Sequence, residues 1–224
     1  MGDAFWETQF PEYNRTIICS LKYFIAEKSK SCRHLLKQAG YPDISQAIIE
    51  EYNEHHYEKD IHHLLRPVSN GYSIGLVSES GCPVIADPGD VLVRLAHQQN
   101  IPIVPLIGPS AVMLVIMASG FNGNNFAFNG YLPIDTHERV RKIRELEQIS
   151  YSKKQAQFFI ETPYRNQKLL SLLLQILQPD TYLSVASFLY HSQTYIKSQP
   201  ISDWKTSNLP DIQKKPCVFG LFKM

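Results

Sequence analysis

The chain has 224 residues, with 22 Lys and Arg against 21 Asp and Glu, so its formal net charge is +1. That length allows one large domain or two small ones, and 44% hydrophobic residues can supply a buried core. A near-neutral chain has no global positive field, so a contact with nucleic acid would have to be a local basic patch.

The cysteines and the start of the chain predict a cytoplasmic protein with no membrane partner. The four cysteines are scattered and form no C-x-x-C pair, which is typical of reduced thiols. Asp3 and Glu7 stand where a signal peptide would need a basic start and an apolar run. The longest apolar run, residues 111–118, is too short to span a bilayer and predicts a buried helix after a turn.

The first third of the chain alternates helical and strand patterns. Residues 14–20 have helical character, residues 23–26 and 47–49 predict strands, and residues 32–38 predict a helix. Ser29 or Ser31 could cap that helix, and Gly40 would end it.

Residues 54–65 predict a polar helix that carries four histidines, His55, His56, His62 and His63. A metal site is an obvious interpretation. However, His55 and His62 are two helical turns apart, too far to share one ion without other ligands. We therefore favour a solvated helix face and predict no metal site.

The centre of the chain reads as strand, helix, strand. Residues 72–77 predict a buried strand, residues 91–99 predict a helix with one apolar face, and the apolar run 101–107 predicts a second strand. Such a unit is almost always parallel and right-handed. The loops 78–89 and 108–111 should therefore lie side by side at the carboxyl edge of the sheet, where ligands bind in open α/β folds.

Both loops consist of small residues, glycines and prolines. Gly81, Gly89 and Gly108 allow sharp turns or a close approach of the backbone to a ligand. The alternative is that both are only tight turns between strand and helix. The chain has no Gly-x-Gly-x-x-Gly and no Walker motif, which argues against the usual nucleotide sites.

Residues 120–125, with two glycines and three asparagines, are the clearest linker, and we place a domain boundary there, between domains 1–122 and 123–224. Strands are predicted at 126–132, 157–161, 182–187, 194–197 and 217–221, and helices at 136–149 and 165–177. In the second domain helices come early and strands late, so it should contain a mixed sheet. The first domain should contain a mostly parallel sheet.

Residues 78–89 read Ser-x-x-Gly-x-Pro-x-Ile-x-Asp-Pro-Gly, and residues 105–110 read Pro-Leu-x-Gly-Pro-Ser. Together they resemble the tetrapyrrole methylase superfamily of S-adenosylmethionine (SAM) methyltransferases, and more closely its ribosomal RNA branch. Residues 126–133, 159–165 and 216–222 resemble it too. The resemblance implies two α/β domains with SAM in the cleft between them, a homodimer, and a ribose hydroxyl of small-subunit ribosomal RNA as methyl acceptor.

The resemblance also implies cofactor-binding residues. The backbone of Ser80, Gly81, Cys82 and Ile85 should hold the methionine part of SAM, Ser110 and Ala111 should flank it, and Ile160 should contact the adenosine. For Ile160 the alternative is ordinary core packing. Relatives that methylate porphyrins have Gly-Asp-Pro where this chain has Gly81-Cys82-Pro83, which favours the RNA branch over a corrin or porphyrin substrate.

Methyl transfer from a sulfonium requires alignment, exclusion of water and help for the acceptor in losing its proton. Candidates for that help stand at strand ends: Glu79, Asp87, Asn129, Glu161 and Arg165. Asp87 could instead be a turn residue and Glu161 a helix cap. Cys82 is expected to be a small filler and not a nucleophile.

The resembling family opens with a strand and a proline-containing loop that ends in glycine and lines the SAM pocket. Gly2-Asp3 resembles the end of that loop, and the strand before it is missing from this sequence. Either the start codon is assigned too late or the strand has been lost. A lost strand would favour a second interpretation, a SAM-binding homologue without catalysis.

Overall fold

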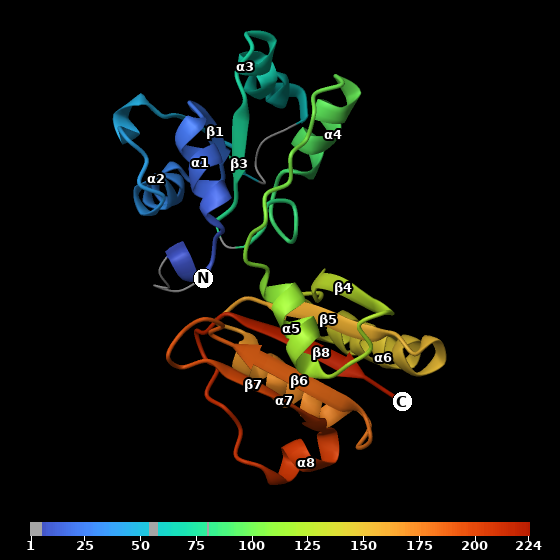
Figure 1. Ribbon diagram of the computed structural model, residues 1–224. Helices are drawn as coiled ribbons and strands as arrows, with labels where there is room; N and C mark the ends of the chain where they lie inside the picture. Colours follow the sequence, from blue (N-terminus) through green and yellow to red (C-terminus); the bar gives the residue numbers. More distant parts are fainter. Residues whose placement is uncertain (1–5, 54–57, 80) are drawn as a thin grey trace. The chain divides into compact units, whose positions relative to one another are not determined.

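The structure is a computed structural model that describes residues 6–53, 58–79 and 81–224 (Figure 1). Its two compact units are Ala4–Ser110 and Ala111–Met224, and each is described by itself below. Each unit is a sheet with helices around it, so the predicted fold class of two α/β domains is confirmed. Gly2-Asp3, where the sequence resembles the end of a family loop, lies outside the described residues.

The first unit is built on a parallel sheet of three strands, β1 (Tyr23–Ala26), β2 (Ile48–Glu51) and β3 (Ile74–Val77), in the order β2-β1-β3. Its α-helices are α1 (Glu12–Ser20), α2 (Ser29–Gln38), α3 (Arg66–Ser69) and α4 (Asp90–Gln98). Short 3-10 helices form at Trp6–Thr8, Ile44–Gln46 and Glu58–Leu65. The predicted parallel sheet is present.

Both faces of β1 are buried, because successive side chains of a strand point to opposite faces. Phe24 lies in one apolar cluster with Leu36 of α2, whereas Ile25 lies in another with Leu92 and Leu95 of α4. The alternation explains why the central strand of this sheet is apolar at every position.

The prediction of a strand at residues 101–107 is wrong. The segment has no strand partner within the described residues. Pro102 and Pro105 have no N–H for a ladder, and Ile103, Val104 and Ile107 are exposed. The segment starts beside Ile74 and Leu76 of β3 and ends beside Cys82 after it, so it runs alongside β3 without pairing.

Two local predictions in the first unit also need correction. Helix α2 begins three residues before the predicted start, and neither Ser29 nor Ser31 caps it: Lys28 is the N-cap and provides no side-chain hydrogen bond. Residues 54–57, with His55 and His56, lie outside the described residues. The part that is described, Glu58–Leu65, is a 3-10 helix and not the predicted α-helix.

The second unit has a mixed five-stranded sheet in the order β4-β5-β8-β6-β7, as predicted. The strands are β4 (Phe126–Tyr131), β5 (Ala156–Glu161), β6 (Tyr182–Ser187), β7 (Tyr195–Pro200) and β8 (Cys217–Phe222). Only the β4–β5 pair is parallel among the described pairings. Four helices accompany the sheet: α5 (Ala111–Ser119), α6 (Thr136–Lys153), α7 (Asn166–Ile176) and α8 (Ile201–Thr206).

Helices cover both faces of this sheet. Helices α6, α7 and α8 form a large core with one face, in which Trp204 is fully buried and donates its indole N–H to the Leu183 carbonyl at 2.9 Å. Helix α5 packs Val115 and Ile116 against Phe158 on the other face.

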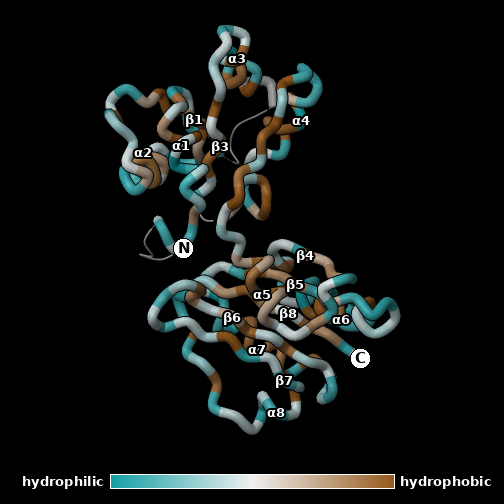
Figure 2. The backbone as a smooth tube through the Cα atoms, viewed as in Figure 1, coloured by the Kyte–Doolittle hydropathy of each residue, from teal (hydrophilic) through white to brown (hydrophobic). Residues whose placement is uncertain are grey.

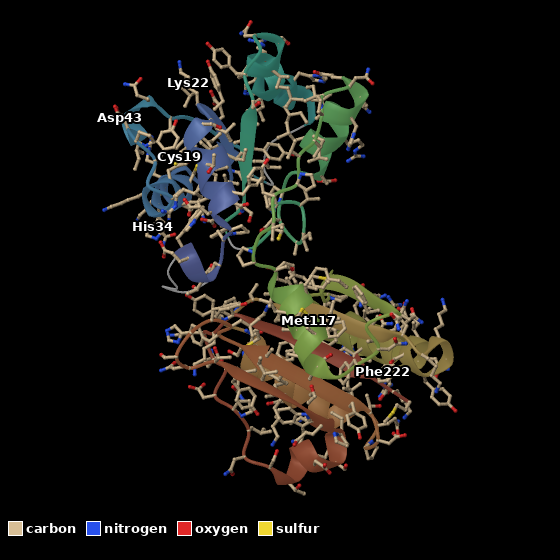
Figure 3. The ribbon with its side chains drawn as sticks, in the orientation of Figure 1. Cys19, Lys22, His34, Asp43, Met117 and Phe222 are labelled. Carbon is tan, nitrogen blue, oxygen red and sulfur yellow. The ribbon has the colours of Figure 1, made fainter. Side chains whose placement is uncertain are left out.

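The packing of helix α5 shows where the boundary between the two units lies. It is hydrophobic along its whole length (Figure 2), yet Met117 is exposed (Figure 3). Because its buried side chains pack on the second sheet, the division lies between Ser110 and Ala111. The asparagine- and glycine-rich linker at 120–125, where the sequence suggested a boundary, is a turn between α5 and β4.

Candidate functional site

The loop that follows β3 has an unusual backbone. Gly81 and Gly89 have φ of 104° and 132°, which a glycine adopts without strain. Val84 and Ala86 also have positive φ, 74° and 60°, although both have a Cβ. A β-branched residue in this region is an outlier, and such strain typically costs about 1–3 kcal/mol per residue and clusters at functional sites.

Short hydrogen-bonded turns hold this loop. The Ser78 hydroxyl donates to the Gly81 carbonyl at 3.0 Å, and the Ile85 N–H donates to the Cys82 carbonyl at 3.3 Å. Gly89 is closely packed, since a Cβ there would lie 3.0 Å from the Leu76 side chain. These contacts anchor the described part of the loop to the end of β3.

Asp87 is the acidic group inside this loop. Its Oδ2 is buried and has no hydrogen-bond partner among the described residues. Burial raises the pKa of the carboxyl, a hydrogen bond from Ser78 partly opposes this, and the charge of Glu79 adds to it. A carboxylate with a raised pKa is a stronger proton acceptor, which keeps Asp87 among the candidate bases.

The loop at 107–109 lies against the first loop, as the sequence predicted. The Cys82 thiol donates to the Pro109 carbonyl at 3.6 Å, and a Cβ on Gly108 would lie 3.9 Å from the Cys82 Sγ. From the other side, Asn14 of α1 donates its side-chain N–H to the Ile107 carbonyl at 2.6 Å. Sequence reasoning missed Asn14, a buried polar residue in a helix whose spacing gave no signal for this contact.

Cys82 has the properties of a filler. Burial is the first cause that raises the pKa of its thiol, and the charge of Asp87 adds to it. The thiolate is the nucleophilic form, so a raised pKa leaves this cysteine unreactive near neutral pH. The four cysteines are all free thiols, as predicted: Cys19, Cys32, Cys82 and Cys217.

The backbone at Gly81 has open space beside it. A Cβ on this glycine would meet no heavy atom of the described residues within 4 Å, so the backbone here is open on one side. The Ile85 side chain nearby is exposed. Ser80, the first of the predicted cofactor residues, lies outside the described residues.

Glu79 is tied to helix α2 and is a poor candidate for a base. Its two oxygens accept hydrogen bonds from the Lys28 ammonium at 2.6 Å and from the Ser31 hydroxyl at 2.8 Å. The hydrogen bond from Lys28 is the largest cause that lowers its pKa. A carboxylate with a lowered pKa accepts a proton less readily.

Asn129 has a structural role in the second sheet. Gly130 next to it has φ of 61°, and the register of β4 against β5 shifts between Phe128 and Tyr131. The Asn129 side chain donates across this bulge to the Gln157 side chain at 3.1 Å and to the Phe158 carbonyl at 3.2 Å. These bonds fill the gap that the bulge leaves in the ladder.

Glu161 lies buried between two arginines at the end of β5. Its Oε1 accepts two hydrogen bonds from Arg165, at 2.7 and 3.0 Å, and one from the Thr162 N–H at 2.7 Å. Its Oε2 lies 3.6 Å from the Arg139 guanidinium, which also donates to the carbonyls of Pro133 and Ile134. The carboxylate is therefore held by charge on both sides.

Helix α6 carries many charged residues, and two of them lie on its inner face. Arg139 and Glu147 are buried. Glu147 accepts hydrogen bonds from the Thr181 hydroxyl and from the Gln178 N–H. Their spacing of eight residues places both on the inner face, a periodic signal that the charges concealed.

The remaining predicted cofactor residues are divided between the units. Ser110 ends the first unit. Ala111 begins α5, Ile160 lies in β5, and both are partly buried against the apolar cluster that contains Phe158. Core packing is thus part of the role of Ile160, as the alternative interpretation held.

In residues 6–53, 58–79 and 81–224, no three His, Cys, Asp or Glu side chains gather closely enough to hold a metal ion. Within the same residues, no helix combines the length and apolar character that crossing a membrane requires.

The fold is that of a known methyltransferase. The solved structure of the methyltransferase CobJ superimposes with a TM-score of 0.62 and covers 97% of this chain and 95% of its own, at 12% sequence identity. This match agrees with the resemblance to tetrapyrrole methylases that the loop motifs indicated. The comparison with models of protein families found no match.

Curated relatives refine the resemblance. The chain is similar to ribosomal RNA small subunit methyltransferase I of Vibrio cholerae, 31% identical over 183 residues, and to that of Escherichia coli O157:H7, 28% identical over 187. These matches take up 82% and 84% of this chain, and 62% and 63% of the relatives. The predicted resemblance to the ribosomal RNA branch is confirmed, and the chain spans less than two thirds of these relatives.

Proposed function

We propose that the protein is a SAM-dependent methyltransferase that acts on a ribose hydroxyl of small-subunit ribosomal RNA. The observation that carries the proposal is the loop after β3, with its strained backbone, its open side at Gly81 and its contact with the 107–109 loop. The names of the curated relatives support the substrate class.

The residues of the first unit fit the cofactor. SAM, when bound, would supply an activated methyl group on a positively charged sulfur. The open backbone at Gly81, with Cys82 and Ile85, would hold its methionine part, and Ser110 would flank the same pocket. Ala111 and Ile160 of the second unit complete the set of cofactor residues that the resemblance implies.

Asp87 is the candidate base. Glu79 has a lowered pKa, Glu161 is held by two arginines, and Asn129 is bonded across the bulge, so each has a structural role. The buried Asp87 carboxyl, with its raised pKa and its unpartnered oxygen, is suited to take the proton of the acceptor hydroxyl. Alignment of donor and acceptor would supply the rest of the rate enhancement.

Two alternative functions differ from the proposed one. A corrin or porphyrin C-methyltransferase shares the fold, but this chain has Cys82 where the porphyrin-methylating relatives have an aspartate. A SAM-binding homologue without catalysis would bind the cofactor and transfer nothing.

Two measurements separate these functions. Calorimetric titration with SAM or with its demethylated product tests the cofactor, and the absence of heat would exclude both the enzyme and the binder. Transfer of labelled methyl groups from SAM to small ribosomal subunits, with mapping of ribose methylation in a deletion strain, tests the substrate. An unchanged methylation pattern would argue against the RNA assignment.

The assembly and location belong to the same proposal. We expect a homodimer in the cytoplasm, on the basis of the resemblance. A monomeric mass by light scattering at micromolar concentration would contradict the dimer.

A further inference from the structure

We propose that the carboxyl edge of the second sheet is a binding surface for single-stranded RNA. This inference rests on the proposed function and identifies where its substrate would bind. The carboxyl edge is defined here as residues 131–135, 161–165, 188–194 and 211–216.

The strand register brings these four segments to one edge. Tyr131 at the end of β4 pairs with Ile160 near the end of β5. Glu161 ends β5 opposite Cys217, the first residue of β8, and Ser187 at the end of β6 is also opposite Cys217. Four segments from distant parts of the sequence therefore leave or enter the sheet along one line.

Hydrogen bonds join the segments into a single surface. The Lys214 N–H donates to the Pro163 carbonyl at 2.9 Å, and the Gln213 side chain donates to the Tyr164 carbonyl at 3.3 Å. The Phe188 N–H donates to the Pro216 carbonyl at 3.3 Å. These bonds connect segments 161–165 and 188–194 with segment 211–216. Segment 131–135 is linked through Arg139, which donates to the Pro133 and Ile134 carbonyls and lies 3.6 Å from Glu161.

Exposed aromatic rings stand on this edge. Tyr164 is 69% exposed, Tyr131 is 54% exposed and Tyr190 is 50% exposed. The ring of His191 lies over that of Phe188, with 4.8 Å between centroids. Unstacked bases of single-stranded RNA bind to such rings, and stacking needs no particular base.

Cations accompany these rings. Lys214 is exposed, Lys215 lies 5.8 Å above the Phe188 ring, and Arg165 is held at the edge by Glu161 with about a third of its side chain exposed. The acids of the edge are all engaged: Asp135 caps α6, Asp211 lies 3.7 Å from Lys215, and Glu161 lies between its two arginines. Because Arg165 and Lys215 are thereby paired with carboxylates, the exposed Lys214 is the residue proposed to contact phosphate.

Positive charge is also concentrated in the second unit of the chain. Residues 111–224 contain 13 Lys and Arg against 8 Asp and Glu, whereas residues 1–110 contain 9 against 13. The near-neutral total hides this difference. A basic unit with aromatic residues among its cations is what a phosphate backbone with splayed bases requires.

The backbone of the edge is strained at the same places. Phe188, Tyr190 and Lys214 have φ of 52°, 61° and 59°, a region that residues with a Cβ rarely adopt. The Thr194 hydroxyl fixes the 188–191 turn by hydrogen bonds to the carbonyls of Phe188 and His191. Strain that is maintained by such bonds points to a functional requirement for these side-chain positions.

The opposite end of the second unit offers a matched control. Tyr151, near the end of α6, is also 50% exposed, and Lys154 lies 4.7 Å above its ring and also has a positive φ. This pair has the same composition as the carboxyl edge. Since α6 starts beside residues 131–135 and extends for 18 residues, the pair lies far from that edge.

The test measures anisotropy of a fluorescein-labelled single-stranded RNA of about twelve nucleotides, at several salt concentrations. We compare Tyr164→Ala, Tyr190→Ala and Lys214→Gln with the control variants Tyr151→Ala and Lys154→Gln. Each edge tyrosine should cost roughly 5- to 100-fold in affinity, the loss expected for one stacked base. Lys214→Gln should lower the salt slope by about 0.7, the contribution of one phosphate contact.

The same variants are titrated with SAM, so that failure of this proposal and of the proposed function can be distinguished. Unchanged SAM affinity in the edge variants, with weaker RNA binding, supports the surface. Edge variants that bind RNA like the control variants would overturn it, even if SAM binding and methyl transfer persist. A loss with Lys214→Gln alone would also overturn it, because it would show a simple anion site without stacking. If the parent protein binds RNA through this edge but not SAM, the methyltransferase proposal fails alone.

Discussion

The Cys82 thiol donates a hydrogen bond to the Pro109 carbonyl, with 3.6 Å between the two heavy atoms. This contact joins the loop after β3 to the 107–109 loop, and the two bonded residues are 27 positions apart in the sequence. It makes the shape of the 81–89 loop depend on the 107–109 loop. The proposed cofactor site is therefore a product of two segments, and either one can disturb it.

We expect Cys82→Ser to retain most SAM binding. The hydroxyl is slightly smaller and can donate to the same carbonyl, and the proposed ligand contact is made by the backbone. Affinity within about tenfold of the parent is expected, since even complete loss of one hydrogen bond costs only about 0.5–1.5 kcal/mol. Calorimetric titration with SAM measures this. A complete loss of binding would show that the thiol itself is required.

Gly81→Val should abolish or strongly weaken SAM binding. The substitution places a branched side chain in the open space beside Gly81, and its φ of 104° adds backbone strain of about 1–3 kcal/mol. Gly71→Val is the matched control, because Gly71 also has a positive φ, 81°, and open space around it, but lies in the turn before β3.

Both glycine variants should lose similar amounts of stability in urea unfolding, and only Gly81→Val should lose SAM affinity. If Gly81→Val folds and binds SAM like the parent, the pocket lies elsewhere. If the two variants lose affinity equally, the effect is one of folding and not of occlusion.

The sequence predicted the sheets better than it predicted the roles of individual charges. Periodicity placed β1, α4 and the mixed sheet correctly, because burial imposes it directly. The run at 101–107 was apolar enough for a strand, but a strand also needs a partner, which no local pattern reveals. The sequence gives no signal that Arg139 is buried beside Glu161, because that pairing joins residues 22 positions apart.

The variant Asp87→Asn should have different effects on the stability of the protein and on methyl transfer. Because burial raises the pKa of Asp87 in the folded protein, its stabilising contribution is full below the unfolded pKa of about 3.9 and is lost as the pH rises through the folded value. At neutral pH the buried charge is therefore unfavourable, and the amide should raise the melting temperature.

The gain from Asp87→Asn should be larger at pH 7.5 than at pH 4, because a raised pKa leaves more of the buried carboxyl protonated at the lower pH. If Asp87 is the base, methyl transfer should fall by roughly 100-fold or more while SAM affinity changes little. Melting curves at both pH values and single-turnover methyl transfer test the two claims separately. Unchanged transfer would remove Asp87 from the mechanism.

Glu161→Gln should destabilise the second unit by about 3–5 kcal/mol, the usual effect of removing one partner of a buried ion pair. The glutamate side chain is fully buried and Arg139 is 10% exposed, so the variant leaves a buried guanidinium without its counter-charge.

Glu145→Gln is the control: Glu145 lies 2.9 Å from Lys142 on the surface of α6, and loss of that pair should cost about 0–1 kcal/mol. Urea unfolding measures both free energies. Equal effects of Glu161→Gln and Glu145→Gln would show that the buried triad contributes no more than a surface pair.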